Sequence, residues 1–399
     1  MSKSQKIVIT ICIFSIITII LVASSFIQIK IIAENNTPEK KIEIGTGGHG
    51  SVGYRSINTS GDILNSVNED DYLSNNNLNP MEYLRDFNYG HVSKTENGST
   101  IREFTLIAQD KKLEVSPGVI MDAWTFNGTV PGPTIRATEG DTIRINFINN
   151  GSQPHSIHTH GIHPAQMDGV FEMVAPKGKF TYEFIAKPFG VFPYHCHMQP
   201  LEEHINRGLY GVYIVDPKIP RPPADEMVMM MNGYDTDFDA ENNFYTVNGL
   251  PYYYMNNPIE IEKDKPIRIY LVNMLEFDQI NNFHLHANMF NYYPSGTMLE
   301  PNQYNDIVTL SQGDRGIVEF NYTYPGKYMF HAHKTEFAEK GWMGTFLVKD
   351  NARKSDLTAS DKGEKIGYNT GQEKNFNSNT NTISELNNQT RREGGNLHR

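Results

Sequence analysis

Residues 183–197 read EFIAKPFGVFPYHCH, and residues 319–333 read EFNYTYPGKYMFHAH. Both stretches begin with Glu-Phe, contain a proline and a glycine, continue with alternating aromatic residues and end in a His-x-His unit. Alternation bounded by proline and glycine is typical of strand–turn–strand sequence. Because the pattern occurs twice with the same internal spacing, we expect two similar β-domains in one chain.

Two more His-x-His units come earlier in the two halves of the chain. They are His158-Thr159-His160 and His284-Leu285-His286. Residues two apart on a strand point to the same face, so each unit presents two imidazoles side by side. The four units together supply eight imidazoles, which suits a group of metal ions better than a single ion.

Cys196 stands between the two histidines of the unit at 195–197. Successive side chains on a strand point to opposite faces, so the thiol must face away from His195 and His197. A metal held by Cys196 would therefore lie across the strand from metals held by its neighbours. Only a few covalent bonds would separate these sites, which offers a short path for electrons.

Two imidazoles and one thiolate with a weak fourth ligand mark a blue-copper electron-transfer site. His155, Cys196 and His204 can supply these three ligands. Leu209 occupies the position shortly after the second histidine, where such sites often carry a weakly bound Met. An apolar residue there should raise the reduction potential.

Three segments resemble the multicopper oxidase family. Residues 126–135, FNGTVPGPTI, look like its first-domain signature, residues 155–161 resemble one ligand loop, and residues 195–209 resemble the other. The resemblance covers roughly residues 100–350. It implies an all-β fold of two consecutive cupredoxin-like Greek-key β-barrel domains, which we place at 96–216 and 217–350.

The family resemblance also implies a ligand set of four coppers per chain. Carried over by position, the type 1 ligands are His155, Cys196 and His204, with Leu209 at the axial position; the type 2 ligands are His158 and His284; and the type 3 ligands are His160, His195, His197, His286, His331 and His333.

Two acidic residues are candidates for proton delivery to oxygen. Asp168 falls where the resemblance implies an acidic residue with this role, and Glu336 follows His333 closely. Each has a plainer interpretation, since Asp168 can cap a turn with Gly169 and Glu336 can be an exposed loop carboxylate.

The second half of the chain departs from the family's type 1 pattern. Ala332 stands where a Cys would be, and Asn281 stands where a His would precede His284. The second domain therefore cannot hold a type 1 copper. The chain resembles the two-domain oxidases in which only the first domain keeps that site.

Charge and the chain ends bear on partners and location. The net charge of −11 argues against nucleic acid. An apolar run from Ile7 to about Phe26 is long enough to span a bilayer, so residues 1–32 are a signal peptide or, as we favour, a membrane anchor. The oxidase domains should then be extracytoplasmic. We expect a polar linker at 33–95 and a disordered polar tail at 351–399.

Each domain offers only half of the ligands for a trinuclear cluster. The family resemblance implies that domain one of one subunit meets domain two of the next and closes a ring of three. We therefore expect a homotrimer with intersubunit copper sites. The run Met227–Met231 fits the first strand of domain two better than a copper shuttle.

The function that follows is oxidation of an unidentified electron donor, one electron at a time, coupled to four-electron reduction of dioxygen to water. The alternative is copper nitrite reductase, which resembles the chain at His155, His160, His195, Cys196 and His204. That enzyme has a catalytic acid at the position of His158 and lacks a counterpart of His197. A non-enzymatic copper or electron carrier ranks last, because eight cluster imidazoles exceed its needs.

Overall fold

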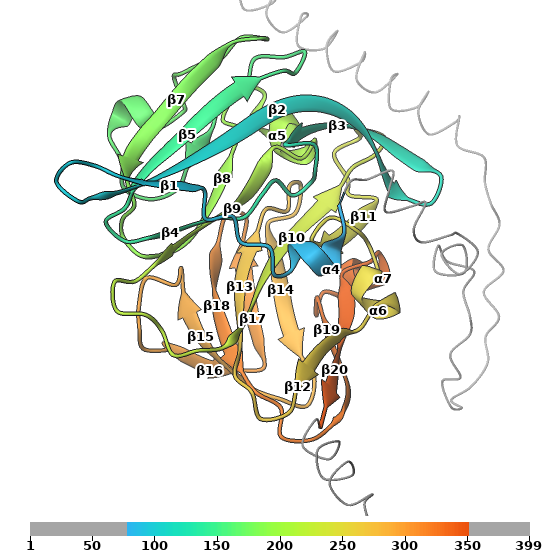
Figure 1. The fold of residues 1–399 in the computed structure, drawn as a ribbon. Helices are drawn as coiled ribbons and strands as arrows, with labels where there is room; N and C mark the ends of the chain where they lie inside the picture. The colour runs from blue at the N-terminus through green and yellow to red at the C-terminus, as the bar shows by residue number, and fades with distance from the viewer. Residues whose placement is uncertain (1–77, 351–399) are drawn as a thin grey trace, which may run out of the picture. The chain divides into compact units, whose positions relative to one another are not determined.

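A computed structural model describes residues 78–350 of the chain. The expected anchor at 1–32, most of the expected linker and the expected tail lie outside these residues. Within 78–350, no helix is long and apolar enough to cross a membrane. The described part is mostly β, with short helices in the connections (Figure 1).

The first half of the described chain forms two sheets, one ordered β1-β2-β5-β7 with β3 on β2 and the other β4-β9-β8-β6. The elements, in chain order, are α4 (Pro80–Tyr83), β1 (His91–Lys94), β2 (Thr100–Ser116), β3 (Val119–Phe126), β4 (Ile135–Thr138), β5 (Thr142–Asn149), β6 (His158–Thr159), η1 (Ala165–Met167), β7 (Lys179–Ile185), β8 (Gly190–His195), α5 (Leu201–Asn206) and β9 (Tyr210–Asp216).

The second half also forms two sheets, ordered β11-β10-β13-β18-β15-β16 and β12-β20-β19-β14-β17. Its elements are β10 (Asp225–Tyr234), β11 (Phe244–Val247), α6 (Tyr253–Asn256), β12 (Ile259–Glu262), β13 (Ile267–Asn273), β14 (Ile280–Leu285), β15 (Phe290–Pro294), β16 (Gln303–Asn305), β17 (Ile307–Ser311), β18 (Arg315–Phe320), β19 (Gly326–His331), α7 (Thr335–Glu339) and β20 (Met343–Lys349).

The strand pairings repeat between the halves. The parallel pairs β2–β5 and β4–β9 correspond to β10–β13 and β12–β20. The antiparallel pairs β5–β7, β8–β9 and β6–β8 correspond to β13–β18, β19–β20 and β14–β19. The expectation of two similar, cupredoxin-like β-domains is thus confirmed.

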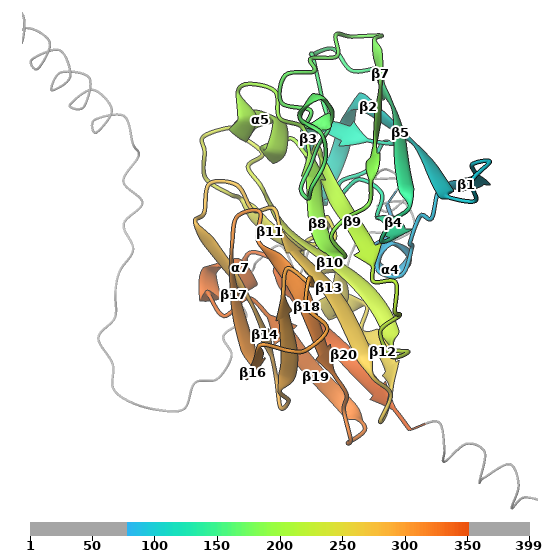
Figure 2. The same cartoon turned by 90° about the vertical axis from the view of Figure 1, so that its left-hand side faces the viewer.

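An apolar cluster joins the two domains. Val212 and Ile214 of β9 pack in one cluster with Val228 and Met230 of β10. The alternate residues of β10, including Met229, face the core of the second domain instead. The methionine run is therefore part of a strand that is buried on both faces. Figure 2 shows the position of β10 between β9 and β13.

Part of the expected polar linker packs against both domains. Leu84, just after α4, is fully buried in the core of the second domain, and its carbonyl accepts from Val228 N at 2.8 Å. Tyr83 Oη donates to the carbonyl of Gly132 in the first domain at 3.0 Å. Residues before position 96 are thus part of the folded body, where they contact both domains.

Candidate metal centres

One thiol and two imidazoles converge inside the first domain. Cys196 directly follows β8, His204 lies on α5, and His155 is held beside Val174 by a backbone bridge. His155 Nδ1 and Cys196 Sγ each lie 3.2 Å from His204 Nδ1, and Sγ lies 3.9 Å from His155 Nδ1. All three side chains are buried.

This arrangement fits a copper ion. Donor atoms spaced in this way can each lie about 2 Å from one common ion. Burial lowers the pKa of His155 to about 3 and that of His204 to about 4, so both imidazoles stay neutral and able to coordinate. Burial raises the pKa of the Cys196 thiol, so the thiolate needs a cation beside it.

The residue expected at the axial position is part of the same loop. Leu209 is fully buried in the core cluster that contains Cys196. Its carbonyl accepts from Cys196 N at 2.9 Å, and its N–H donates to the carbonyl of His204 at 3.2 Å. An aliphatic side chain offers no donor atom, and the Ser156 N–H contacts the sulfur at 3.4 Å.

Four further imidazoles of the first domain form a tetrad. The β6–β8 register places His158 opposite His195, and His160 Nε2 lies 3.3 Å from His195 Nε2. The ring of His197 lies 5.3 Å from that of His158. His158 Nδ1 donates to the carbonyl of Asp168 at 2.8 Å, and His195 Nδ1 donates to that of Cys196 at 2.8 Å. Such bonds fix the tautomer and leave Nε2 as the metal-binding atom.

The second domain repeats this tetrad. His284 lies opposite His331 in the β14–β19 register, and His286 Nε2 lies 2.9 Å from His331 Nε2. The ring of His333 lies 5.2 Å from that of His284. His284 Nδ1 and His331 Nδ1 donate to backbone carbonyls at 2.9 and 2.7 Å, as their counterparts do. His286 and His333 are exposed.

In the second domain, apolar side chains occupy the positions that correspond to the type 1 ligands. The N–H of Ala332 donates to Trp342 O, and that of Trp342 donates to Phe337 O. These bonds match those that link Cys196, Leu209 and His204, so Phe337 corresponds to His204 and Trp342 to Leu209. Phe337 and Trp342 are fully buried. The second domain thus has neither the ligands nor the space for a type 1 ion.

Of the two carboxylates expected to relay protons, only one contacts a tetrad. Asp168 Oδ1 lies 3.2 Å from His158 Nδ1 and 3.7 Å from His163 Nε2. The next residue, Gly169, has a φ of +74°, and a Cβ there would collide with the carbonyl of Ile157. Asp168 therefore does cap the short turn η1. Gly169 packs closely against the backbone of Ile157 in the ligand loop.

Glu336 has surface partners instead. It lies on α7 and pairs with the two lysines that flank this helix, Lys340 at 3.1 Å and Lys334 at 3.9 Å, and about half of its side chain is exposed. These contacts match the plainer interpretation of an exposed carboxylate.

One residue near the type 1 ligands, Trp124, was missed by the sequence reasoning. The ring of Trp124, on β3, lies 4.7 Å from that of His204 and 5.3 Å from that of His155. His163 Nε2 donates to the carbonyl of Thr159 within the ligand loop at 2.8 Å. Trp124 is far from its contacts in sequence, and no local pattern signals them.

Two cavities stand out, and only one borders the ligands. A cavity of about 880 Å³ is lined by Trp124, His197, Met198, His204 and Arg207, among others. It brings solvent to the edge of the type 1 cluster. This is where a reductant could approach His204.

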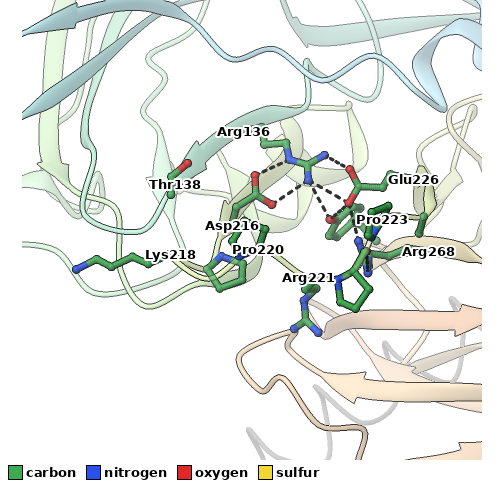
Figure 3. A pocket seen from close by; sticks show the side chains of 13 residues that line it. Arg136, Thr138, Asp216, Lys218, Pro220, Arg221, Pro223, Glu226 and Arg268 are labelled. Carbon is green, nitrogen blue, oxygen red and sulfur yellow. Dashed lines mark hydrogen bonds and ion pairs between the residues drawn. The ribbon is translucent and has the colours of Figure 1, made fainter.

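The other cavity, of about 330 Å³, lies at the interdomain linker and contains none of the candidate ligands (Figure 3). There Arg136 of β4 pairs with Asp216 at 2.8 Å and with Glu226 at 2.7 Å, while Arg268 pairs with Glu226 at 3.0 Å. Burial opposes ionisation, but hydrogen bonds from Arg136 and Tyr270 lower the pKa of Glu226 to about 2. This charge network joins the domains.

Proteins of similar sequence and structure are described as copper oxidases. A solved structure described as a multicopper oxidase is 52% identical, covers 69% of this chain and 99% of its own, and has a TM-score of 0.69. A blue copper oxidase from Nitrosomonas europaea is 29% identical, covers 62% of this chain and 86% of its own, and has a TM-score of 0.57.

A nitrite reductase is related as well. The copper-containing nitrite reductase of Neisseria meningitidis is 30% identical over 263 residues, which is 60% of this chain and 67% of that protein.

Two family models, both described as multicopper oxidase, match residues 108–219 and 220–352. Their junction falls in the linker between β9 and β10. With the histidine and cysteine clusters of both domains, these matches show that the chain belongs to the multicopper oxidase family and is a copper-dependent oxidoreductase.

Proposed function

We propose that this protein oxidises a donor one electron at a time and reduces dioxygen to water, with four coppers per chain. The observation that carries the proposal is the pair of matching imidazole tetrads, one per domain. Bound copper would supply one-electron transfer at the type 1 site and four-electron reduction of dioxygen at a trinuclear cluster.

The residues of the chain would divide these tasks. His155, Cys196 and His204 would hold the type 1 ion, with the apolar side chain of Leu209 in the same loop. His158 and His284 would hold the type 2 ion. The type 3 pair would be held by His160, His195, His197, His286, His331 and His333. Asp168 holds a carboxylate 3.2 Å from His158 Nδ1, where it can pass protons to the cluster.

We propose that the two tetrads meet between subunits of a homotrimer. Within residues 78–350, ring contacts and hydrogen bonds join imidazoles of the same domain, and none joins the two tetrads. His286 and His333 are exposed on the second domain, as expected of ligands that face another subunit. Rotationally closed head-to-tail contacts would complete three clusters in a ring.

The proposed location is outside the cytoplasm. The apolar run from Ile7 to about Phe26 would target or anchor the chain at the membrane, with the copper domains outside. Cell fractionation with protease added to intact cells tests this, because a cytoplasmic protein would be protected from digestion.

Nitrite reduction is the second candidate, on account of the nitrite reductase that is 30% identical. The imidazole at position 158 argues against it, because a catalytic acid is expected there. Since His158 Nδ1 donates to the Asp168 carbonyl, its Nε2 is directed to metal binding.

Parallel assays of oxygen uptake and nitric oxide release separate the two activities. We expect the copper-loaded protein to consume oxygen with one-electron donors, and H286A to lose at least about a hundredfold of this rate. H91A removes an exposed histidine outside the clusters and serves as the matched control. Nitric oxide release from nitrite without oxygen uptake would contradict the proposal.

A further inference from the structure

The helix that carries the type 1 ligand His204 is held by the second domain. Asn206, at the end of α5, exchanges two hydrogen bonds with the backbone of Asp235, just after β10. The Asp235 N–H donates to Asn206 Oδ1 at 3.3 Å, and Asn206 Nδ2 donates to the Asp235 carbonyl at 3.5 Å. Both residues are buried.

The carboxylate of Asp235 shapes the loop that makes this contact. Its Oδ1 accepts from the N–H of Phe238 at 2.6 Å, and its Oδ2 accepts from that of Ala240 at 2.9 Å. Phe238 and Ala240 have φ angles of 60° and 69°, which few residues adopt without such support. The carboxylate of Asp235 thus holds the turn that carries Phe238.

Arg207 lies between that phenylalanine and Trp124. Its guanidinium carbon lies 4.2 Å from the centre of the Phe238 ring and 4.7 Å from that of the Trp124 ring. Its Nε donates to Glu203 at 2.9 Å and its Nη1 to the carbonyl of Asp122 at 2.8 Å. A cation fixed between two aromatic faces is favourable on both sides.

Trp124, one of the two aromatic residues beside Arg207, also contacts the type 1 cluster. Trp124 packs with its ring 4.7 Å from that of His204 and 5.3 Å from that of His155. Trp124, His204 and Arg207 also line the cavity of about 880 Å³. Trp124 thus lines the same cavity as the imidazole of His204 that it contacts.

The helix has little stability of its own. It spans only six residues, Leu201–Asn206, and its N-cap residue Pro200 makes no capping hydrogen bond through its side chain. So short a helix is not stable in isolation, so its position depends on what it packs against. Asn206 and Arg207, at its end, both reach the second domain.

We propose that the loop 235–240 of the second domain is a latch that positions the type 1 site of the first domain. Phe238 and Arg207 are positioning residues: they hold Trp124 against His204 and His155, and Asn206 holds α5. The second domain thereby sets the geometry of a copper site to which it contributes no ligand.

The latch can be tested without copper. The chain has two tryptophans, and Trp342 is fully buried in the second domain, so a change in fluorescence reports Trp124. In the apo-protein, we expect F238A and R207M to shift emission to longer wavelength and to increase quenching by acrylamide. R207K keeps the cation and should restore part of the protection. Y324A removes an exposed aromatic outside the latch and should leave emission unchanged.

The second readout, on copper-loaded protein, rests on the proposed function. F238A should change the type 1 absorption band and reduction potential and lower kcat about tenfold with KM little changed, as misplaced groups do. The EPR signal of the type 2 copper should stay the same. If the wild type binds no type 1 copper, the proposed function fails, but the apo-protein result still decides whether the latch exists.

Wild-type emission and quenching in folded F238A and R207M, as judged by circular dichroism, would overturn the latch. So would a type 1 band and potential that neither variant alters. If R207M does not fold, F238A decides alone, because its side chain is 45% exposed and contributes little to the core.

Discussion

Single residues distinguish the type 1 cluster of the first domain from the corresponding position in the second domain. Cys196 and His204 bring a thiol and an imidazole within 3.2 Å, whereas Ala332 and Phe337 fill the same positions with apolar groups. The change from Cys196 to Ala332 could be read from the sequence, since both stand between two histidines of a repeated unit. The match of Phe337 to His204 could not, because it rests on backbone hydrogen bonds within the fold. The contact of Trp124 with His204 could not, because it depends on how β3 packs across the ligand loop.

Leu209 should set the potential of the type 1 copper. In L209M, a thioether could approach the ion from the axial side and lower the reduction potential, by roughly 59 mV if it changes the one-electron equilibrium tenfold. Redox titration of the blue absorption band measures this. An unchanged potential in a blue, folded variant would show that residue 209 does not face the copper.

Buried imidazoles should make the apo-protein sensitive to acid. Burial lowers the pKa of His155 and His160 to about 3 and that of His195 and His204 to about 4. Below about pH 6.5 the imidazoles of the unfolded chain take up protons, whereas these imidazoles in the folded protein stay neutral. Their contribution to the free energy of unfolding is therefore fully present above that pH and falls as the pH approaches 4. Each group contributes up to about 1.4 kcal/mol per pH unit in this window.

Thermal melts of the apo-protein at pH 7, 5.5 and 4.5 test this directly. We expect Tm to fall steadily as the pH is lowered. Bound copper should not remove this fall, because coordinated imidazoles stay neutral in the folded protein while those of the unfolded chain still take up protons. A Tm that is independent of pH over this range would mean that the imidazoles are hydrated.

At the scale of elements, the duplicated strand–turn–strand sequence predicted β7–β8 and β18–β19. The same pattern could not predict α4, because this short helix lies in an otherwise polar segment. Its position depends on packing against both domains. Nor could it predict the charge network at the linker. Arg136 and Glu226 lie on β4 and β10, which meet only when the two domains pack.

Arg136 should contribute to the stability of the domain pair. R136M leaves the carboxylates of Asp216 and Glu226 half-buried without their main partner, which should cost about 2 kcal/mol after allowance for their exposure. Denaturant unfolding measures it. The control, R144M, breaks exposed pairs with Glu103 and Glu183 and should cost less than about 1 kcal/mol. Equal losses would argue against the interdomain role.

At the scale of the whole molecule, each chain presents two half-sites. The sequence supplied all eight imidazoles, and the fold gathers them into two tetrads of matching geometry. In the proposed trimer the two tetrads meet across a contact with a neighbouring subunit, and no pattern within one chain reveals that contact surface. The trimer is therefore the prediction that most needs a test of its own.

Mixed assemblies provide that test. H158A damages the tetrad of the first domain, and H284A damages that of the second. If each cluster forms between subunits, a trimer containing both variants has one intact pair of tetrads, or about a third of the sites. Co-expression should then restore part of the oxygen uptake that each variant lacks alone. No recovery in mixed trimers would place each cluster within one chain.

The copper content of the purified, reconstituted protein, measured together with its EPR spectrum, tests the central claim most directly. We predict four coppers per chain, of which one gives a type 1 signal, one gives a type 2 signal and two form a coupled, EPR-silent pair. Two coppers per chain, both visible by EPR, would contradict the trinuclear cluster and support nitrite reductase chemistry instead.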